Sequence, residues 1–503
     1  GMLEHVNALE GERPQEALNY YLKCALRPSP EGTADLSEVF TSHLDKIVAC
    51  LGSSDEQVVD LAVNLFEAVL EQRLGLELVA KPELHPLLDS CVHHPNVKLR
   101  RIVLNAFLRL AGIVPRGIVA LFESDNISTV FNLLRDEDTG IAQKAHDVVV
   151  QLMQSPVAHE RFNQSAHLIA QLNSLVTLKS DKAGTDLAVR IMDCFADAAA
   201  LSNEASFRFC EATGILDDIV SGVVTPTADI LMLLNYLVLL QKILASDLGV
   251  PFLQTRPQVF PRIAGLVCHE DPSIAGFGMQ FMADFCKKGD EQCGMAIEHE
   301  WLKKLFVIIC DDDTPLDVLQ GAAEAIGYMA STAVGLSYLL DSSEVFHAYA
   351  NLLLPSSRSP REVRTAVLHS LAAIFDSQST PEAQLQSAFE FLFSGSVGGR
   401  RFEELLEARR NFDNDMRMGA LHLLHAVAGH PFGALALARA EGFLAWLTNR
   451  LNENEKEGLE YKFGIGQKMH KSVEAISREL GGEASMGLRV FVQLGPFSGG
   501  ERM

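Results

Sequence analysis

The sequence predicts an all-α protein in which similar helical units repeat along the chain and stack into a right-handed solenoid. Of its 503 residues, 48% are apolar and 7% aromatic, with much Leu and Ala, a composition that favours helices around a large buried core. A polar turn followed by a helix of small and apolar residues recurs many times. Examples are SSDEQVVDLAVNLFEAVL from Ser53 and SPREVRTAVLHSLAAIF from Ser359.

The spacing of these helices identifies the type of repeat. One early apolar residue per helix gives a ladder with successive steps of 39, 44, 46, 44, 43, 44, 45 and 53 residues. The ladder consists of Val58, Val97, Ile141, Leu187, Leu231, Ile274, Val318, Val363 and Met416, of which Leu187 and Leu231 are placed partly by their spacing. Steps of about 40–47 residues are typical of armadillo and HEAT repeats. We expect about nine units of roughly 44 residues, and a third helix in each unit favours the armadillo form.

The array divides the chain into three expected segments. Residues 1–41 form an N-terminal segment and cap, residues 42–451 form the repeat array, and residues 452–503 form a C-terminal capping segment. A single unit cannot bury its own apolar face, so both ends of a solenoid need covering.

The turns and small residues in each unit have structural explanations. In Asp271-Pro272 and Ser359-Pro360 a capping side chain precedes a proline that the first helical turn tolerates. Glycines inside the long helices, such as Gly276, cost about 1 kcal/mol relative to alanine, which indicates close approach between stacked helices.

The C-terminal segment contains a stretch that could be mistaken for a phosphate loop. Residues 452–460 are expected to be a solvated break, and residues 460–497 to cover the last apolar face. The sequence GIGQKM at Gly464 follows no strand and has no Ser or Thr after its lysine, which excludes a Walker motif. We expect Gly464 and Gly466 to serve a turn or close packing, and Lys468 to be incidental.

Charge and cysteine usage limit the partners and the compartment. The net charge of -23 repels phosphate backbones, so we expect no nucleic-acid partner. The nine cysteines include no C-x-x-C pair. We expect them to be small buried residues of a protein in a reducing compartment. The longest nearly apolar run, Ile230 to Leu240, is too short to span a bilayer. We expect a soluble protein of the cytoplasm, with the nucleus as a second location.

Motifs for catalysis, cofactors and metals are missing from the sequence. It contains no Walker sequence, no G-x-S-x-G and no H-E-x-x-H. Neither His93-His94 nor the pair His422 and His425 is followed by a second ligand pair at a zinc spacing. We therefore expect a binding scaffold with no enzyme activity, no cofactor and no metal.

Three stretches resemble one known family. They are RPQVFPRIAGLVCHEDPSIAGFGMQFMADFCKKGDEQCGMAI from Arg256, MGALHLLHAVAGHPFGALALARAEGFLAWLTNR from Met418, and LRVFVQLGPF from Leu488. They resemble the proteasome non-ATPase regulatory subunit 5 family, over a span from about Ser42 to Phe497. The resemblance implies a non-catalytic chaperone that assembles the base of the 26S proteasome regulatory particle. Such chaperones bind the small C-terminal domain of one ATPase-ring subunit and leave before the mature particle forms.

The residues that contact the partner are predicted from their place in the repeat. Third helices of armadillo units usually line the concave face of the solenoid, so polar and aromatic residues there are the candidates. The six candidates are Asp217, Asp218, Arg262, Lys304, Tyr349 and Asn351.

Two other functions remain open at this stage. A generic armadillo scaffold with another client, such as a cofactor that grips an Hsp70-type ATPase, would show the same periodicity. An enzyme domain could also lie in the least regular N-terminal segment. Under the favoured hypothesis the free protein is a monomer, and its partners are the ATPase-ring subunit and associated base subunits, with no membrane.

Overall fold

The computed structural model describes most of the chain as helix. The described residues are 2–11, 13–27, 29–123, 125–177, 182–201, 203–227 and 229–496. Their regular elements run from α1 to α34 with two short 3₁₀ turns, and these residues form no strand beyond one isolated bridge. The predicted all-α helical-repeat solenoid is confirmed.

The chain divides into two units, residues 1–252 and 253–503. The long helices of the first unit are α2 Pro14–Leu26, α5 Glu56–Leu70, α8 Val97–Ala111, α11 Thr139–Met153, α14 Lys182–Ala200 and α17 Ile230–Ala245. Its shorter elements are α1 Met2–Ala8, α3 Pro30–Ser42, α4 Leu44–Leu51, α6 Arg73–Val79, η1 Pro82–Leu84, α7 His85–Val92, α9 Arg116–Phe122, α10 Asn126–Leu133, α12 Pro156–Gln164, α13 Ala166–Thr177, α15 Glu204–Ala212 and α16 Ile215–Val224. Helix α18 Gly249–Gln254 lies at the division.

The second unit continues the same pattern. Its long helices are α20 Pro272–Cys286, α23 Leu316–Met329, α26 Arg361–Phe375, α29 Asn414–Ala428 and α32 Lys456–His470. Its shorter elements are α19 Val259–Leu266, α21 Asp290–Glu298, α22 Trp301–Cys310, α24 Ala333–Asp341, α25 Ser343–Asn351, α27 Glu382–Phe393, α28 Gly395–Ala408, α30 Pro431–Arg439, α31 Phe443–Thr448, η2 Arg450–Asn452, α33 Val473–Leu480 and α34 Gly482–Leu494.

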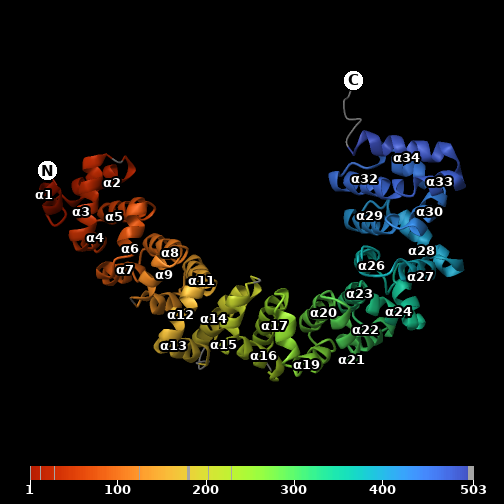
Figure 1. The fold of residues 1–503 in the computed structure, drawn as a ribbon, viewed down its shortest axis with the longest axis horizontal. Coiled ribbons are helices and arrows are strands. Elements are labelled where there is room, and N and C mark those ends of the chain that lie inside the picture. Colours follow the sequence, from red (N-terminus) through yellow and green to blue (C-terminus); the bar gives the residue numbers. More distant parts are fainter. Residues whose placement is uncertain are drawn as a thin grey trace. The chain divides into compact units, whose positions relative to one another are not determined.

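Every residue of the sequence ladder lies near the start of a long helix. Within each unit, consecutive long helices pack against one another: α2 to α17 in the first unit and α20 to α32 in the second (Figure 1). Leu231 departs most from a buried ladder, because it is 75% exposed while Leu233, two positions later, is buried. Val97 and Val318 are partly exposed. Helices α2 and α32 lie outside the predicted array of residues 42–451 but pack on α5 and α29. The division into cap, array and cap stays a prediction.

Local sequence explains where the long helices begin. The carboxylate of Asp271 accepts the backbone N–H of Ser273 at 2.8 Å, and Pro272 occupies the first turn of α20, as predicted. The second predicted cap is wrong. Ser359 is buried and donates its hydroxyl to the carbonyl of Leu352, so it ties the chain to the end of α25 and does not cap α26.

The cysteines are free thiols among the described residues. Six are buried, as expected for small core residues, but Cys268 and Cys310 are exposed. The buried set is Cys50, Cys91, Cys194, Cys210, Cys286 and Cys293. In the described part of the chain, no helix combines the length and the apolar character that a bilayer crossing requires.

The C-terminal segment partly follows its prediction. A Cβ atom on Gly464 would lie 2.8 Å from the His425 ring, and one on Gly466 would lie 2.7 Å from the Phe491 ring, so both glycines permit close helix packing. Helix α32 already begins at Lys456, which shortens the predicted solvated break. Phe497, the last residue of the predicted cover, lies outside the described residues.

The expectation that Lys468 is incidental is wrong. Its Nζ atom lies 3.4 Å from Oδ1 of Asp376 and 3.3 Å from Nδ1 of His425. The lysine therefore links α32 to the C-terminal end of α26 and to α29.

Candidate functional site

Five of the six predicted contact residues reach the surface. Asp217 and Asp218 lie on α16 in the first unit and are partly exposed. Asp218 also lines an open cavity of about 420 Å³. In the second unit Arg262 on α19 is partly exposed and Lys304 on α22 is exposed. Their role in binding stays a prediction.

The prediction is wrong for Tyr349. Its side chain is 0% exposed, and its hydroxyl forms a hydrogen bond with the hydroxyl of Ser370 on α26. Burial is the main cause that raises the pKa of Tyr349, which keeps the phenol protonated. Tyr349 lies on the apolar face of α25 that the helical spacing predicts. That face packs against the core, so Tyr349 cannot contact a partner.

Asn351 is exposed but also has a structural role. Its Oδ1 accepts hydrogen bonds from Nη2 of Arg401 at 2.9 Å and from Nε at 3.2 Å. Arg401, a residue of α28, is fully buried. It also donates a hydrogen bond to the Leu392 carbonyl at 3.3 Å. Because a buried guanidinium needs its donors satisfied, Asn351 stabilises the fold there.

The structure adds a surface that the contact prediction missed, along the long helices of the second unit. Two adjoining cavities of about 310 and 360 Å³ lie over α20, α23 and α26 and share Gln320, Glu324 and Tyr328. We call this surface the long-helix groove. Its acidic lining residues are Asp317, Glu324, Glu362 and Asp415.

The long-helix groove has an excess of negative charge. Arg361 is the one arginine or lysine among the described lining residues, and its guanidinium is already paired with Glu362 at 2.8 Å and with Asp413 at 2.7 Å. The Nζ atom of Lys287 lies 3.8 Å from the Tyr328 ring. The groove could therefore accept a basic segment. Its sequence signal was the recurrence of polar residues at a spacing of four on a long helix, as in Gln320, Glu324 and Tyr328.

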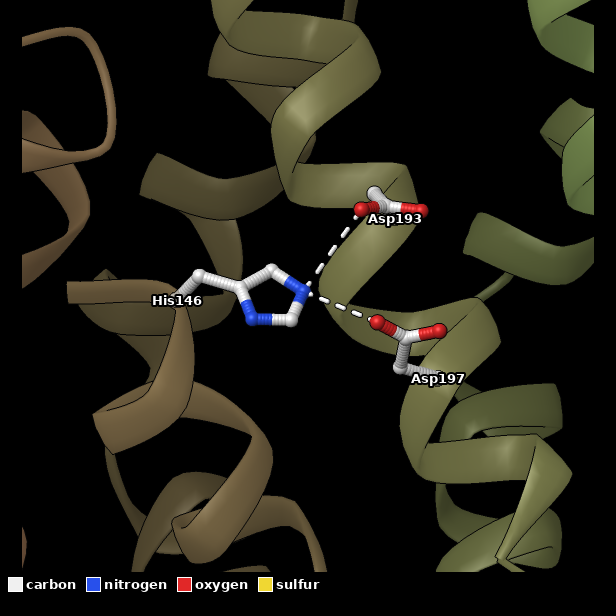
Figure 2. A group of neighbouring side chains, drawn as sticks. All are labelled: His146, Asp193 and Asp197. Carbon is white, nitrogen blue, oxygen red and sulfur yellow. Dashed lines mark ion pairs between the residues drawn. The ribbon is translucent and has the colours of Figure 1, made fainter. Parts of the chain in front are cut away.

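A second polar cluster lies on the long helices of the first unit (Figure 2). The Nε2 atom of His146 on α11 lies 3.1 Å from Asp197 and 3.6 Å from Asp193, both on α14. One imidazole and two carboxylates are donors that a divalent metal accepts, and their ligand atoms all lie within 4.8 Å of one another.

The ammonium group of Lys242 on α17 already forms ion pairs with the two carboxylates. Its Nζ atom lies 2.5 Å from Asp193 and 2.7 Å from Asp197. Burial lowers the pKa of His146, but Asp197, Asp193 and Asp147 outweigh that effect, and the net shift is upward. The arrangement is an ion-pair network that joins α11, α14 and α17. The positive charge of Lys242 would repel a divalent cation at this place.

The predicted histidine pair belongs to a comparable network in the second unit. Nε2 of His422 lies 3.3 Å from Oδ2 of Asp376, and Nδ1 of His422 lies 3.0 Å from Nδ1 of His369. Burial, helped by the charge of Lys468, lowers the pKa of His425 to about 4. The ring of His425 is therefore neutral at pH 7.

Comparison with known proteins decides the family. The family model described as proteasome non-ATPase 26S subunit matches residues 2–499. The chain belongs to this family. As a member of the proteasome non-ATPase 26S subunit family, it is a proteasome-associated helical scaffold. The match also includes residues 2–41, which precede the span that resembles the subunit 5 family.

The other comparisons add little. No curated protein sequence matches the chain. The crystal structure of an engineered protein from the Northeast Structural Genomics Consortium is similar, at 15% identity and a TM-score of 0.44. The alignment covers 85% of this chain and 98% of that one. A likeness at this level carries no argument about fold or function.

Proposed function

We propose that this member of the proteasome non-ATPase 26S subunit family is an assembly chaperone for the base of the regulatory particle, corresponding to subunit 5. It binds the C-terminal domain of an ATPase-ring subunit and leaves before the mature particle forms. The observation that carries the proposal is the family match over residues 2–499, together with the three resembling stretches of sequence.

Helical solenoids suit this work because stacked units present extended surfaces to a folded partner. Two surfaces are available for it. One is the short-helix surface around Asp217 and Asp218 in the first unit, and the other is the long-helix groove of the second unit. The net charge of -23 favours a partner with basic or mixed charge.

We further propose that the protein is not an enzyme and needs no cofactor. Two clusters of titratable residues in the described part of the chain, around His146 and around Asp376, consist of side chains that pair with one another and stabilise helix contacts. The protein acts as a monomer before it meets its client, in the cytoplasm with the nucleus as a second location.

The test is a binding experiment with purified components. The full chain is mixed with the isolated C-terminal domain of each ATPase-ring subunit, and complexes are separated by size-exclusion chromatography. The ATPase domain of an Hsp70 serves as the rival client. Co-elution with one of the ring-subunit domains supports the proposal. Binding of the Hsp70 domain alone, or of no ATPase domain, contradicts it.

A charge-reversal pair assigns the surface. The double variant Asp217→Lys with Asp218→Lys should weaken capture of the ring-subunit domain and leave the melting temperature within a few degrees. The matched double variant Glu324→Lys with Asp415→Lys reverses two charges in the long-helix groove. If only the second variant loses binding, the client occupies the groove, and the short-helix prediction is wrong.

A further inference from the structure

An open pocket of about 800 Å³ lies near the C-terminal end of the second unit. Its walls come from the turn before α29 and the first turn of α29, from α31, and from the turn before α32. We call it the loop pocket. Three arginines line it, Arg409, Arg410 and Arg417, with Trp446 and the 104% exposed ring of Phe412.

Arg409 is a buried cation with incomplete partners. Its side chain is 4% exposed, and its Nε atom has no hydrogen-bond partner in the part of the chain that the structure describes. One Nη atom donates to the carbonyl of Leu406, and the guanidinium lies 5.0 Å from the Trp446 ring. No ion pair joins Arg409 to a carboxylate among the described residues.

A second buried cation lies against the same tryptophan. Lys462 is 1% exposed, and its Nζ atom lies 4.7 Å from the Trp446 ring. Nζ donates to the carbonyl of Asn449 at 2.6 Å and to Oδ1 of Asn452. Burial is the first cause that lowers the pKa of Lys462 to about 8. The charge of Glu453 opposes this shift, and the charges of Arg450 and Arg409 add to it.

The carboxylates of the loop pocket form no ion pair with Arg409 or Lys462 among the described residues, although the charge of Glu453 partly offsets that of Lys462. Glu453 pairs with Nε of Arg417 at 3.2 Å and accepts the backbone N–H groups of Asn454 and Glu455, each at 3.0 Å. The other lining carboxylate, Glu455, is exposed at the rim. Burial first, and then the charge of neighbouring Arg410, lowers the pKa of Arg409 to about 10, and the charge of Glu407 offsets only part of this shift.

We propose that the loop pocket binds an acidic segment of a partner protein. A carboxylate side chain of that segment pairs with Arg409 and Arg410, and an apolar neighbour packs on Phe412. A guanidinium fork matches carboxylate geometry, and a buried cation without a counter-ion is costly until it is paired. Arginine and tryptophan are also the residues that most often dominate binding energy at interfaces.

The choice of a peptide carboxylate over a nucleic-acid phosphate follows from the rest of the chain. A net charge of -23 opposes a long phosphate backbone but permits a short acidic segment in a locally basic pocket. The inference does not rest on the proposed client, because any acidic segment of suitable size tests it. Its failure would leave the assembly-chaperone proposal intact, and the reverse also holds.

The natural tryptophans make the test direct. The chain has two, and Trp301 is fully buried with its indole N–H donated to the Phe260 carbonyl at 3.0 Å, so Trp446 reports on the loop pocket. The full chain is titrated with a short acetylated and amidated peptide of Glu, Asp and Leu. A second peptide replaces the acids by Gln and Asn. We expect a saturable change in tryptophan fluorescence with the acidic peptide alone, weaker at high salt.

Variants connect the signal to the loop pocket. Arg410 is exposed, so Arg410→Glu should fold and should weaken binding of the acidic peptide by about tenfold or more. Arg410→Gln should give a smaller loss. The matched control Arg400→Glu changes another exposed arginine, on α28 outside the loop pocket, and should bind as the wild type does.

Four results would overturn the inference. They are equal binding of the neutral peptide, unchanged affinity in Arg410→Glu, an equal loss in Arg400→Glu, and tighter binding of single-stranded DNA than of the acidic peptide. The last result would assign the loop pocket to phosphate.

Discussion

Gly327 on α23 lies against Ser370 on α26 so closely that a Cβ atom on the glycine would be 2.2 Å from the Cβ of the serine. Backbone atoms of Ser370 would lie 2.7 Å from it. The buried hydroxyl of Ser370 also bonds to the hydroxyl of Tyr349 on α25. Three helices of the second unit therefore meet at one point, and only glycine fits there.

The substitution Gly327→Ala should destabilise the second unit by about 3 kcal/mol, because the added methyl group meets the backbone of another helix. The matched control is Gly276→Ala in α20, where an added Cβ meets nothing within 4 Å, so the close helix approach predicted at this glycine is wrong. That change should stabilise the protein by about 1 kcal/mol through helix propensity. Urea unfolding of both variants measures the two effects. Equal midpoints would show that α23 and α26 can separate without cost.

The substitution Lys242→Met should destabilise the first unit by about 1 kcal/mol, after allowance for solvent screening of a partly exposed group. It leaves the carboxylates of Asp193 and Asp197 without their ammonium partner. Thermal unfolding of the variant is compared with that of Lys304→Met, an exposed lysine on α22. The network has no structural role if both variants melt as the wild type does.

Zinc should raise the melting temperature of Lys242→Met more than that of the wild type. Without Lys242, His146 and the two aspartates form a three-ligand donor set with room for water, so Zn²⁺ should raise the melting temperature of Lys242→Met. The wild type should respond little, because the lysine charge opposes the ion. Adding Asp197→Asn to the variant should abolish the response. A zinc response in the wild type equal to that of the variant would contradict this account.

The stability of the second unit should fall in mild acid, in part through His425. Its folded pKa of about 4 lies below the unfolded value of about 6.5, so the unfolded chain binds a proton that the folded chain does not. This cost is absent above pH 6.5 and grows as the pH falls toward 4. Between pH 7 and pH 5, His425→Gln should lose about 2 kcal/mol less stability than the wild type. Parallel stability curves for the two proteins would disprove the assignment.

Truncation after Leu451 should yield a protein that aggregates and melts earlier. Helix α32 covers α29 and α34 covers α31, so their removal exposes apolar faces. Size-exclusion chromatography and calorimetry measure the effect. Within the cover, Ile465→Ala should cost about 2–4 kcal/mol because Ile465 is fully buried. The exposed Leu494→Ala should change stability by less than about 0.5 kcal/mol. A soluble, stable truncated chain would argue against capping.

Much of the fold was predictable from local patterns. A polar turn followed by small and apolar residues is a signal that each stretch carries within itself, so Val58 and Met416 mark helices correctly although they lie at opposite ends of the ladder. Asp271 and Pro272 set the start of α20 for the same reason, since capping involves only neighbouring residues. The period of the ladder then implies that units stack.

The sites depended on tertiary structure. A repeat period tells which helices stack, but it leaves open how far each helix is rotated about its own axis. That rotation buried Tyr349, brought Lys468 to Asp376, and joined His146 to Asp193 and Asp197 on another helix. It also placed Arg409 and Lys462 against Trp446. By itself the sequence determined the helices and their order, because those depend on neighbours along the chain. Only packing between helices decided which side chains meet, because a contact between residues on different helices has no local signal.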